Sequence, residues 1–230
     1  MEADDLISRI VACRRCPRLV LYREEVAKNP PKRFRGWTYW ARPLPGFGDL
    51  TGRILVVGLA PAAHGGNRTG RMFTGDSSAN FLMSVLHELK LANKPTSESA
   101  DDGLELRGVF LTAPVRCAPP ENRPTREEVE NCYPFLLEEV RLLTQLRVVV
   151  ALGAIGFRAS VRLLRDLGFR SDVQSKFGHG ATYAFRSEDG REVFLLGSYH
   201  PSRQNTQTGR LTRQMLLKVF RRAKELAGYS

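Results

Sequence analysis

Short apolar segments rich in β-branched residues alternate along this chain with amphipathic helical patterns, and this alternation constrains the fold most. None of the apolar segments alternates between apolar and polar residues, so both faces of each strand are expected to be buried, as in parallel sheets. The apolar segments lie at residues 53–59, 108–112, 148–152 and 192–196, and the helical patterns at 77–91, 126–143, 155–167 and 212–226. The sequence therefore predicts an α/β fold, a three-layer α/β/α sandwich with a central, mainly parallel four-stranded sheet.

The length of the chain fits a single domain. A chain of 230 residues forms one well-buried α/β domain and is short for two, so we expect one domain over residues 1–230. The longest apolar runs, 54–63 and 148–157, are much shorter than the roughly 20 residues that span a bilayer. The acidic N-terminus has no basic segment followed by an apolar one, as a secretory signal would. We expect a cytoplasmic monomer without membrane contact.

The charge of the chain indicates a polyanionic partner. The formal net charge is +11 and the isoelectric point is about 10.0. Most of the 35 basic residues are arginine, whose planar guanidinium matches phosphate oxygens well. Nucleic acid is therefore the leading partner, although a compositional or thermal-stability bias would also raise the arginine content.

Four cysteines are candidate metal ligands. Cys13 and Cys16 form a C-x-x-C pair, and Cys117 and Cys132 complete a set of four. Four thiolates can hold either zinc or an iron-sulfur cluster. A second C-x-x-C pair, usual for zinc, is missing, but the spacing alone leaves both metals and ordinary buried thiols open. Disulfides are not expected in the cytoplasm.

Loops that follow the predicted strands are the expected ligand sites, because parallel sheets bind ligands at the carboxyl ends of their strands. These loops are 60–76, 113–124, 153–154 and 198–210, and residues 177–185 are expected to add a short hairpin or edge element. The stretch "ILVVGLAPAAHGG" runs from a strand into the first loop, and it offers only His64 for chemistry. Further along, Phe73 lies among glycines and arginines, which suits a stacked base. Asp76 precedes a helical pattern and is explained by N-capping alone.

The loop "GSYHPSRQNTQTGR" has the composition of a DNA-backbone contact. His200 follows a strand, and its simplest interpretation is a cap or a satisfied buried imidazole. The polar and cationic residues that follow His200 suit phosphate binding, and we predict DNA contacts for Ser202, Arg203, Gln204, Asn205 and Arg210.

Taken together, these motifs resemble the uracil-DNA glycosylase superfamily, and within it the iron-sulfur branch called family 5 or type b. The resemblance covers nearly the whole chain: the C-x-x-C start, "GLAPAAHGGNRTGRMFTGD", "RCAPPENRPT" with the following Cys132, and "GSYHPSRQNTQTGR". The order and spacing of the motifs are more specific than any single motif.

The resemblance implies a monofunctional DNA-repair glycosylase with an N-terminal iron-sulfur segment. It implies a structural 4Fe-4S cluster on Cys13, Cys16, Cys117 and Cys132. It also implies that Phe73 stacks on a flipped base, that His200 lies near the base carbonyl, and that the loop 201–210 enters the duplex. Damaged double-stranded DNA is the expected partner, with single-stranded DNA as a second candidate.

Two departures from the better-known relatives predict a broad substrate range. Leu59 stands where the related branch has an acidic residue, and Ala113 stands where relatives have an asparagine that reads uracil. The usual water activator and base reader are therefore both missing. We expect hypoxanthine and xanthine to be removed as well as uracil.

The remaining residues allow a mechanistic hypothesis. Asp76 would orient water or stabilise the sugar cation, and His200 would donate a hydrogen bond to the departing base. Asn122 would replace the missing base reader, although an asparagine between prolines also fits a turn. The predicted substrate-binding set is Gly58, Leu59, Ala60, Pro61, Phe73, Asn122 and His179.

Two other function classes remain open. The main alternative is a non-catalytic nucleic-acid-binding module that zinc holds together. A nucleotide-binding Rossmann enzyme is disfavoured, since "GLAPAAHGG" lacks the G-x-G-x-x-G pattern.

Overall fold

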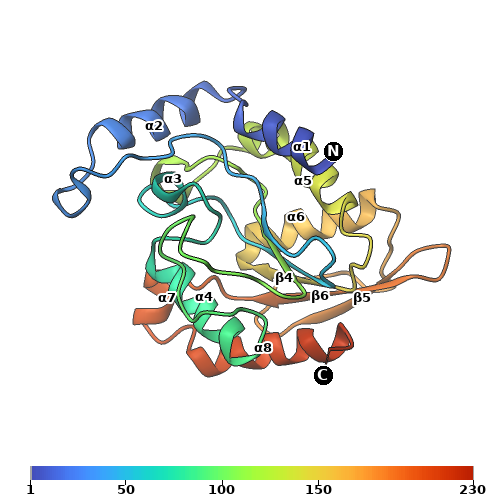
Figure 1. Ribbon diagram of the computed structural model, residues 1–230. Helices are drawn as coiled ribbons and strands as arrows, with labels where there is room; N and C mark the ends of the chain where they lie inside the picture. The colour runs from blue at the N-terminus through green and yellow to red at the C-terminus, as the bar shows by residue number, and fades with distance from the viewer. Residues whose placement is uncertain (1, 230) are drawn as a thin grey trace.

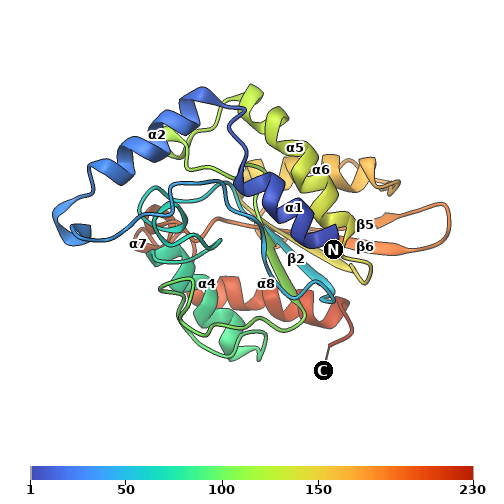
Figure 2. The same ribbon diagram turned by 45° about the horizontal axis from the view of Figure 1, so that its top comes forward.

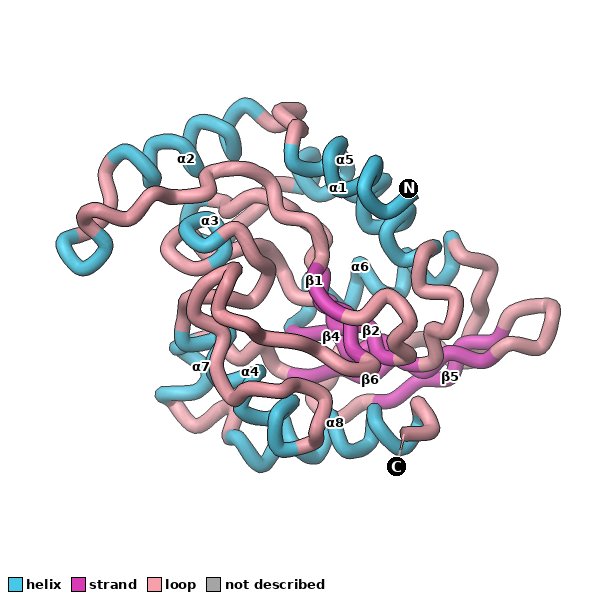
Figure 3. The backbone as a smooth tube through the Cα atoms, viewed as in Figure 1, coloured by secondary structure: helices cyan, strands magenta, loops and turns pink. Residues whose placement is uncertain are grey.

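A single mixed sheet forms the centre of the computed structural model, which describes residues 2–229. Within those residues the sheet has six strands in the order β1-β3-β2-β4-β6-β5. The strands are β1 (Phe47–Gly48), β2 (Ile54–Val57), β3 (Val109–Thr112), β4 (Val148–Leu152), β5 (Thr182–Arg186) and β6 (Glu192–Ser198). The four inner strands are parallel, whereas β1 and β5 pair antiparallel at the two edges. Figure 3 shows the strands in magenta, enclosed by helices.

The predicted four-stranded sheet is confirmed in its centre and corrected at its edges. All four predicted strands are present and parallel, but two edge strands widen the sheet. β1 is only two residues long, too short to leave an apolar pattern in the sequence. β5 is the edge element that was expected near residues 177–185.

Helices cover both faces of the sheet, as Figures 1 and 2 show. On one face α4 and α8 pack against strand residues such as Val56 and Val150. On the other face α5 and α6 pack against neighbouring residues such as Leu55 and Val149. The α-helices are α1 (Glu2–Val11), α2 (Pro17–Lys28), α3 (Gly66–Thr69), α4 (Ser77–Glu88), α5 (Arg126–Arg141), α6 (Gly153–Asp166), α7 (Arg203–Gln207) and α8 (Arg213–Leu226), and the 3-10 helices are η1 (Lys32–Phe34) and η2 (Pro120–Asn122). The three-layer sandwich is confirmed.

The helix boundaries follow local capping chemistry. Thr125 and Glu128 form a capping box at the start of α5, and Thr212 caps α8. The expected loop at 153–154 is instead the first turn of α6. Gly153 has a φ of +88°, a conformation that favours glycine, and it lets β4 pass directly into the helix.

The carboxyl ends of the parallel strands meet at one end of the sheet, and the N-terminal part of the chain crosses that end. In Figure 1 α2 lies above α3, and α7 lies beside α4. Hydrogen bonds from Trp40 N–H to Arg68 O (3.1 Å) and from Ala41 N–H to Asn67 O (3.0 Å) join the N-terminal segment to the α3 region. Within residues 2–229 no helix has the length and apolar character that crossing a membrane requires.

Candidate active site

A cavity of about 750 Å³ opens at the carboxyl ends of the strands. It brings together the loops after β2, β3 and β6, as the sequence predicted for parallel strands. From the predicted set it is lined by Leu59, Ala60, Pro61, Phe73, Asp76, Asn122, His200, Ser202 and Arg203. Apolar walls with a few polar groups are typical of small-ligand sites.

Phe73 forms a flat wall of this cavity. Its φ is +50°, an unusual conformation for a bulky residue. Its ring lies directly over Gly58, since a Cβ added to Gly58 would stand 2.6 Å from Cζ of Phe73. Gly58 therefore does not line the cavity but makes room for the ring. Phe73 is also stacked with His200, with ring centroids 6.4 Å apart and an interplanar angle of 24°.

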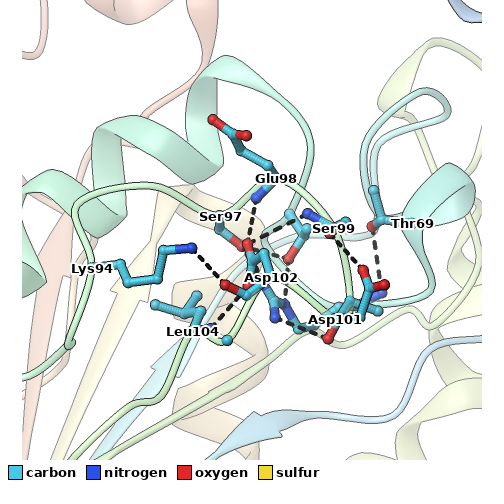
Figure 4. Close-up of polar contacts among 12 residues, drawn as sticks. Thr69, Lys94, Ser97, Glu98, Ser99, Asp101, Asp102 and Leu104 are labelled. Carbon is cyan, nitrogen blue, oxygen red and sulfur yellow. Dashed lines mark hydrogen bonds and ion pairs between the residues drawn. The ribbon is translucent and has the colours of Figure 1, made fainter.

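A buried ionic network holds the backbone on both sides of Phe73. Both oxygens of Asp102 accept hydrogen bonds from Nη2 of Arg71, at 2.9 Å each. Thr74 Oγ1 accepts one from Arg71 Nε (2.9 Å), and Thr74 also shares a hydrogen bond with Ser97 (2.6 Å). Figure 4 shows the loop of residues 94–104 folded around Asp102. The backbone carbonyl of Asp102 accepts a hydrogen bond from Lys94 Nζ.

The charge of Asp102 is strongly favoured. Burial opposes its ionisation, but N–H groups of Glu98 and Leu104 and the Arg71 guanidinium outweigh burial and lower its pKa to about 2. The unusual backbone of Phe73 is therefore supported by a charged pair, not by the loop alone.

Asp76 both caps α4 and lines the cavity. Its Oδ1 accepts the Ala79 N–H at 2.8 Å, so it is the N-cap of α4. Its Oδ2 faces the backbone of Gly65, where an added Cβ would stand 2.5 Å away, and the side chain also lines the cavity. Burial raises the pKa of Asp76, while backbone N–H groups and Arg68 act in the opposite direction.

His200 lies at the end of β6 and presents a neutral imidazole. Burial lowers its pKa to about 4. Its backbone carbonyl accepts a hydrogen bond from Asn205 Nδ2 at 2.9 Å. A neutral imidazole can donate one hydrogen bond into the cavity without carrying a charge.

The loop after His200 places cations at the mouth of the cavity. Ser202 caps the short helix α7, and Arg203, next to it, is exposed. Gln204 and Arg210 are exposed outside the cavity lining, and the Arg210 guanidinium stacks on the Tyr199 ring with 4.7 Å between its carbon and the ring centroid. The side chains of Arg203, Gln204 and Arg210 are therefore accessible from solvent.

Two predicted substrate contacts differ in their position. Asn122 is exposed at the rim of the cavity, and its φ of +56° agrees with a turn. His179 does not line the cavity. Its ring stacks on Tyr199, and its Nδ1 accepts the Tyr199 N–H at 3.2 Å. His179 therefore supports the strand end behind the site.

The N-terminal part of the chain forms a wall of the cavity that was not predicted from the sequence. Tyr22 of α2 and Arg33 and Phe34 of η1 line it. His64 lines it too, and its Nδ1 is hydrogen-bonded to the Tyr39 hydroxyl at 2.9 Å. The available signal was the density of aromatic and basic residues between 32 and 42.

The four cysteines line one common cavity, close to α2 and α5. Arg23 donates from Nη1 to the Cys117 sulfur at 2.9 Å, and Asn131 donates to the Cys16 sulfur at 3.6 Å. Burial raises the pKa of Cys117 to about 12, against the effect of Arg23. Residues 2–229 contain no group of three or more His, Cys, Asp or Glu side chains arranged to hold a metal ion.

Comparisons with known proteins give one consistent result. The family model described as the uracil DNA glycosylase superfamily matches residues 45–224. A Type-5 uracil-DNA glycosylase of Thermus thermophilus is 54% identical over 228 residues, which cover 99% of this chain and 100% of that protein. A Type-5 uracil-DNA glycosylase of Pyrobaculum aerophilum is 50% identical over 98% of this chain and 93% of its own length. A Type-4 uracil-DNA glycosylase of the same organism is 32% identical over 71% of this chain and 74% of its own length.

Proposed function

Because the chain belongs to the uracil-DNA glycosylase superfamily, we propose that it is a DNA-repair glycosylase that hydrolyses the N-glycosidic bond of uracil in DNA. The observation that carries this proposal is the joint position of Phe73, Asp76 and His200 on one cavity at the strand ends. The site supplies a flat aromatic wall for a base, a carboxylate and a neutral hydrogen-bond donor. The product is an abasic site and a free base.

The substrate enters as a flipped nucleotide, because the target atom cannot be reached inside a duplex. Its base stacks on Phe73 in the cavity. As the C1′–N bond breaks, its electron pair passes to the base, and a hydrogen bond from neutral His200 stabilises the developing negative charge. Asp76 stabilises the positive charge on the sugar and orients the water that adds to C1′. The proton that this water loses ends on the departing base.

The cavity walls favour a wide range of deaminated bases. Leu59 and Ala113 both line the cavity and offer no polar side-chain group. Discrimination between bases depends on polar groups that are left unpaired by the wrong base, so an apolar wall discriminates weakly. Hypoxanthine and xanthine are therefore proposed as further substrates. Asn122 at the rim is the proposed polar contact to the base edge.

A structural 4Fe-4S cluster is proposed for the cysteine cavity. Four thiols face one space, and two of them receive hydrogen bonds from Arg23 and Asn131, as sulfur ligands of clusters do. When bound, the group would link α2, the loop after β3 and α5. It takes no part in the hydrolysis.

The proposed partner is damaged DNA, which the protein binds as a monomer in the cytoplasm. The net charge of +11 and the exposed Arg203 and Arg210 support binding through phosphates. Each phosphate contact releases counterions, so DNA affinity should fall steeply with salt.

One set of assays tests the proposal. Purified protein is incubated with duplexes that contain uracil, hypoxanthine or xanthine, and released base is measured together with iron, sulfide and zinc in the same sample. We expect release of all three bases and a brown, iron-containing protein. Release of uracil alone would contradict the broad range. A colourless zinc protein that binds DNA without releasing any base would support the binding-module alternative.

A further inference from the structure

The segment 28–42 lies at the mouth of the cavity and is rich in basic residues. It contains no Asp or Glu. Within residues 2–229 its basic side chains form no ion pairs, and they are exposed: Lys28, Lys32, Arg33, Arg35 and Arg42. Arg33 itself lines the cavity. Such a segment attracts a polyanion to the edge of the site.

A buried arginine fixes this segment and adds to its charge. The Arg68 guanidinium carbon lies 4.3 Å from the ring centroid of Phe34 and 4.2 Å from that of Trp37. Arg68 is only 5% exposed, and it donates to the His64 and Gly75 carbonyls at 2.8 and 3.0 Å. Its Nη1 is buried without a hydrogen-bond partner in residues 2–229. Arg68 therefore holds Phe34 and Trp37 in place and adds a positive charge beneath them.

Two tryptophans of the segment are held rigidly and still face solvent. Trp37 is 49% exposed and Trp40 is 37% exposed. Trp40 packs on Gly70, where an added Cβ would stand 3.0 Å from the ring, and its Nε1 donates to Pro43 O at 3.2 Å. Rigid, exposed aromatic rings between cations are the arrangement with which proteins bind unpaired nucleotides.

We infer that segment 28–42 binds an unpaired nucleotide next to the flipped one, with its base stacked on Trp37 and its phosphates near Arg33 and Arg35. This inference rests on the proposed function. The segment lies on the α2 side of the site, whereas α7 lies on the α4 side (Figures 1 and 3). A strand whose lesion occupies the cavity can therefore continue over segment 28–42. A base that remains paired in a duplex is not free to stack on Trp37, so the segment favours single-stranded DNA.

The test compares DNA binding by the wild type, Trp37→Ala and Trp37→Phe. The probes are a labelled single strand and the matching duplex, each with an uncleavable abasic-site analogue. Since stacking on one aromatic side chain contributes about 1–3 kcal/mol, Trp37→Ala should raise the single-strand Kd by about 5- to 150-fold. The duplex Kd should change much less, and Trp37→Phe should restore most of the single-strand affinity.

A matched control removes another exposed apolar side chain. Val173 is 60% exposed and does not line the cavity, so Val173→Ala should leave both affinities unchanged. Thermal unfolding of Trp37→Ala identifies any loss of the contact with Arg68, and binding is measured well below that transition. Arg35→Gln should lower the salt dependence of single-strand binding by about one phosphate contact.

The outcomes separate this inference from the proposed function. If the wild type releases uracil while Trp37→Ala binds single strands as tightly as the wild type, the inference is wrong and the function stands. An equal loss of single-strand and duplex affinity would also overturn it. If the wild type releases no base but Trp37→Ala selectively loses single-strand binding, the proposed function is wrong and the binding site stands.

Discussion

Gly58 lies so close beneath the ring of Phe73 that a Cβ atom added to Gly58 would stand 2.6 Å from Cζ of Phe73. A Cβ atom does not approach a non-bonded carbon that closely, so any side chain at position 58 moves the ring. The ring is the wall on which we propose that the base stacks. The glycine that directly follows β2 therefore sets the width of the cavity.

Gly58→Ala is expected to lower the single-turnover rate of uracil release by about 10- to 100-fold, because a displacement of about 1 Å is enough to spoil a reactive geometry. The far end of the Phe73 side chain can move, so the fold should survive. The matched control is Gly178→Ala, where the nearest atom would stand at an ordinary 3.6 Å. A wild-type rate in Gly58→Ala would show that Phe73 does not position the base.

Asp76→Asn separates the capping role of Asp76 from the role of its negative charge. The amide oxygen can still accept the Ala79 N–H, so α4 keeps its cap, while the negative charge is lost. We expect a fall of about 10²- to 10³-fold in single-turnover rate with an unchanged melting temperature. Asp76→Ala should also lose about 1 kcal/mol of stability through the cap. A rate near that of the wild type in Asp76→Asn would leave Asp76 as a cap only.

The raised pKa of Asp76 predicts how the activity and stability of the wild type depend on pH. Burial makes the folded pKa higher than the unfolded one, so the carboxylate becomes protonated, and activity falls, at a higher pH than for an ordinary aspartate. The contribution of Asp76 to stability is present at low pH and lost as pH rises through that pKa. Asp76→Asn should therefore be at least as stable as the wild type at neutral pH, as urea unfolding can measure.

The sequence predicted those parts of the site that local rules determine. Asp76 directly before a helical pattern predicted an N-cap, and the N-cap is present. Phe73 and His200 follow different strands, and parallel pairing alone brought both to one cavity. These predictions needed only periodicity and the rule for strand ends.

The N-terminal wall depends on contacts between distant segments and could not be predicted in this way. The backbone carbonyl of Arg23 accepts a hydrogen bond from Asn67 Nδ2, across 44 residues of sequence. This hydrogen bond and those of Trp40 and Ala41 to the α3 region hold α2 and η1 against the cavity. Long-range contacts of this kind leave no periodic signal, so Tyr22 and the residues of η1 were not expected at the site.

His200 is predicted to act as a neutral donor. Its pKa of about 4, lowered by burial, leaves the imidazole uncharged between pH 5 and 8. His200→Ala should lower the single-turnover rate by about 10²-fold and change the DNA Kd much less. The pH profile of the wild type should show no step near the ordinary histidine value of 6.5. An effect confined to the Kd would assign His200 to DNA-backbone contact.

The same pKa predicts acid sensitivity of the fold. The folded pKa lies below the unfolded one, so the contribution of His200 to stability is present above about pH 6.5 and is lost as pH falls towards 4. The free energy of unfolding, measured in urea, should therefore differ less between pH 7 and pH 4.5 in His200→Gln than in the wild type. Equal differences would mean that the imidazole is not desolvated.

Asp102→Asn tests the network that supports Phe73. Arg71 is buried, and the Asp102 side chain is only 10% exposed. Removal of the carboxylate charge leaves the buried guanidinium uncompensated and should cost about 3–5 kcal/mol of unfolding free energy. The folded pKa of about 2 lies below the ordinary value of 3.8, so this stability is present above about pH 4 and is lost as pH falls through 2.

The neighbouring Asp101 provides the control, since it is exposed and accepts a hydrogen bond only from Ser99 Oγ among the side chains of residues 2–229. Asp101→Asn should leave the urea midpoint within about 0.5 kcal/mol of the wild type. Below its own melting transition Asp102→Asn should also release uracil more slowly, because Arg71 and Thr74 no longer hold the backbone of Phe73 at its unusual φ. If Asp102→Asn lost stability but kept the full rate, the conformation of Phe73 would depend on Gly58 and the loop itself and not on the ionic pair.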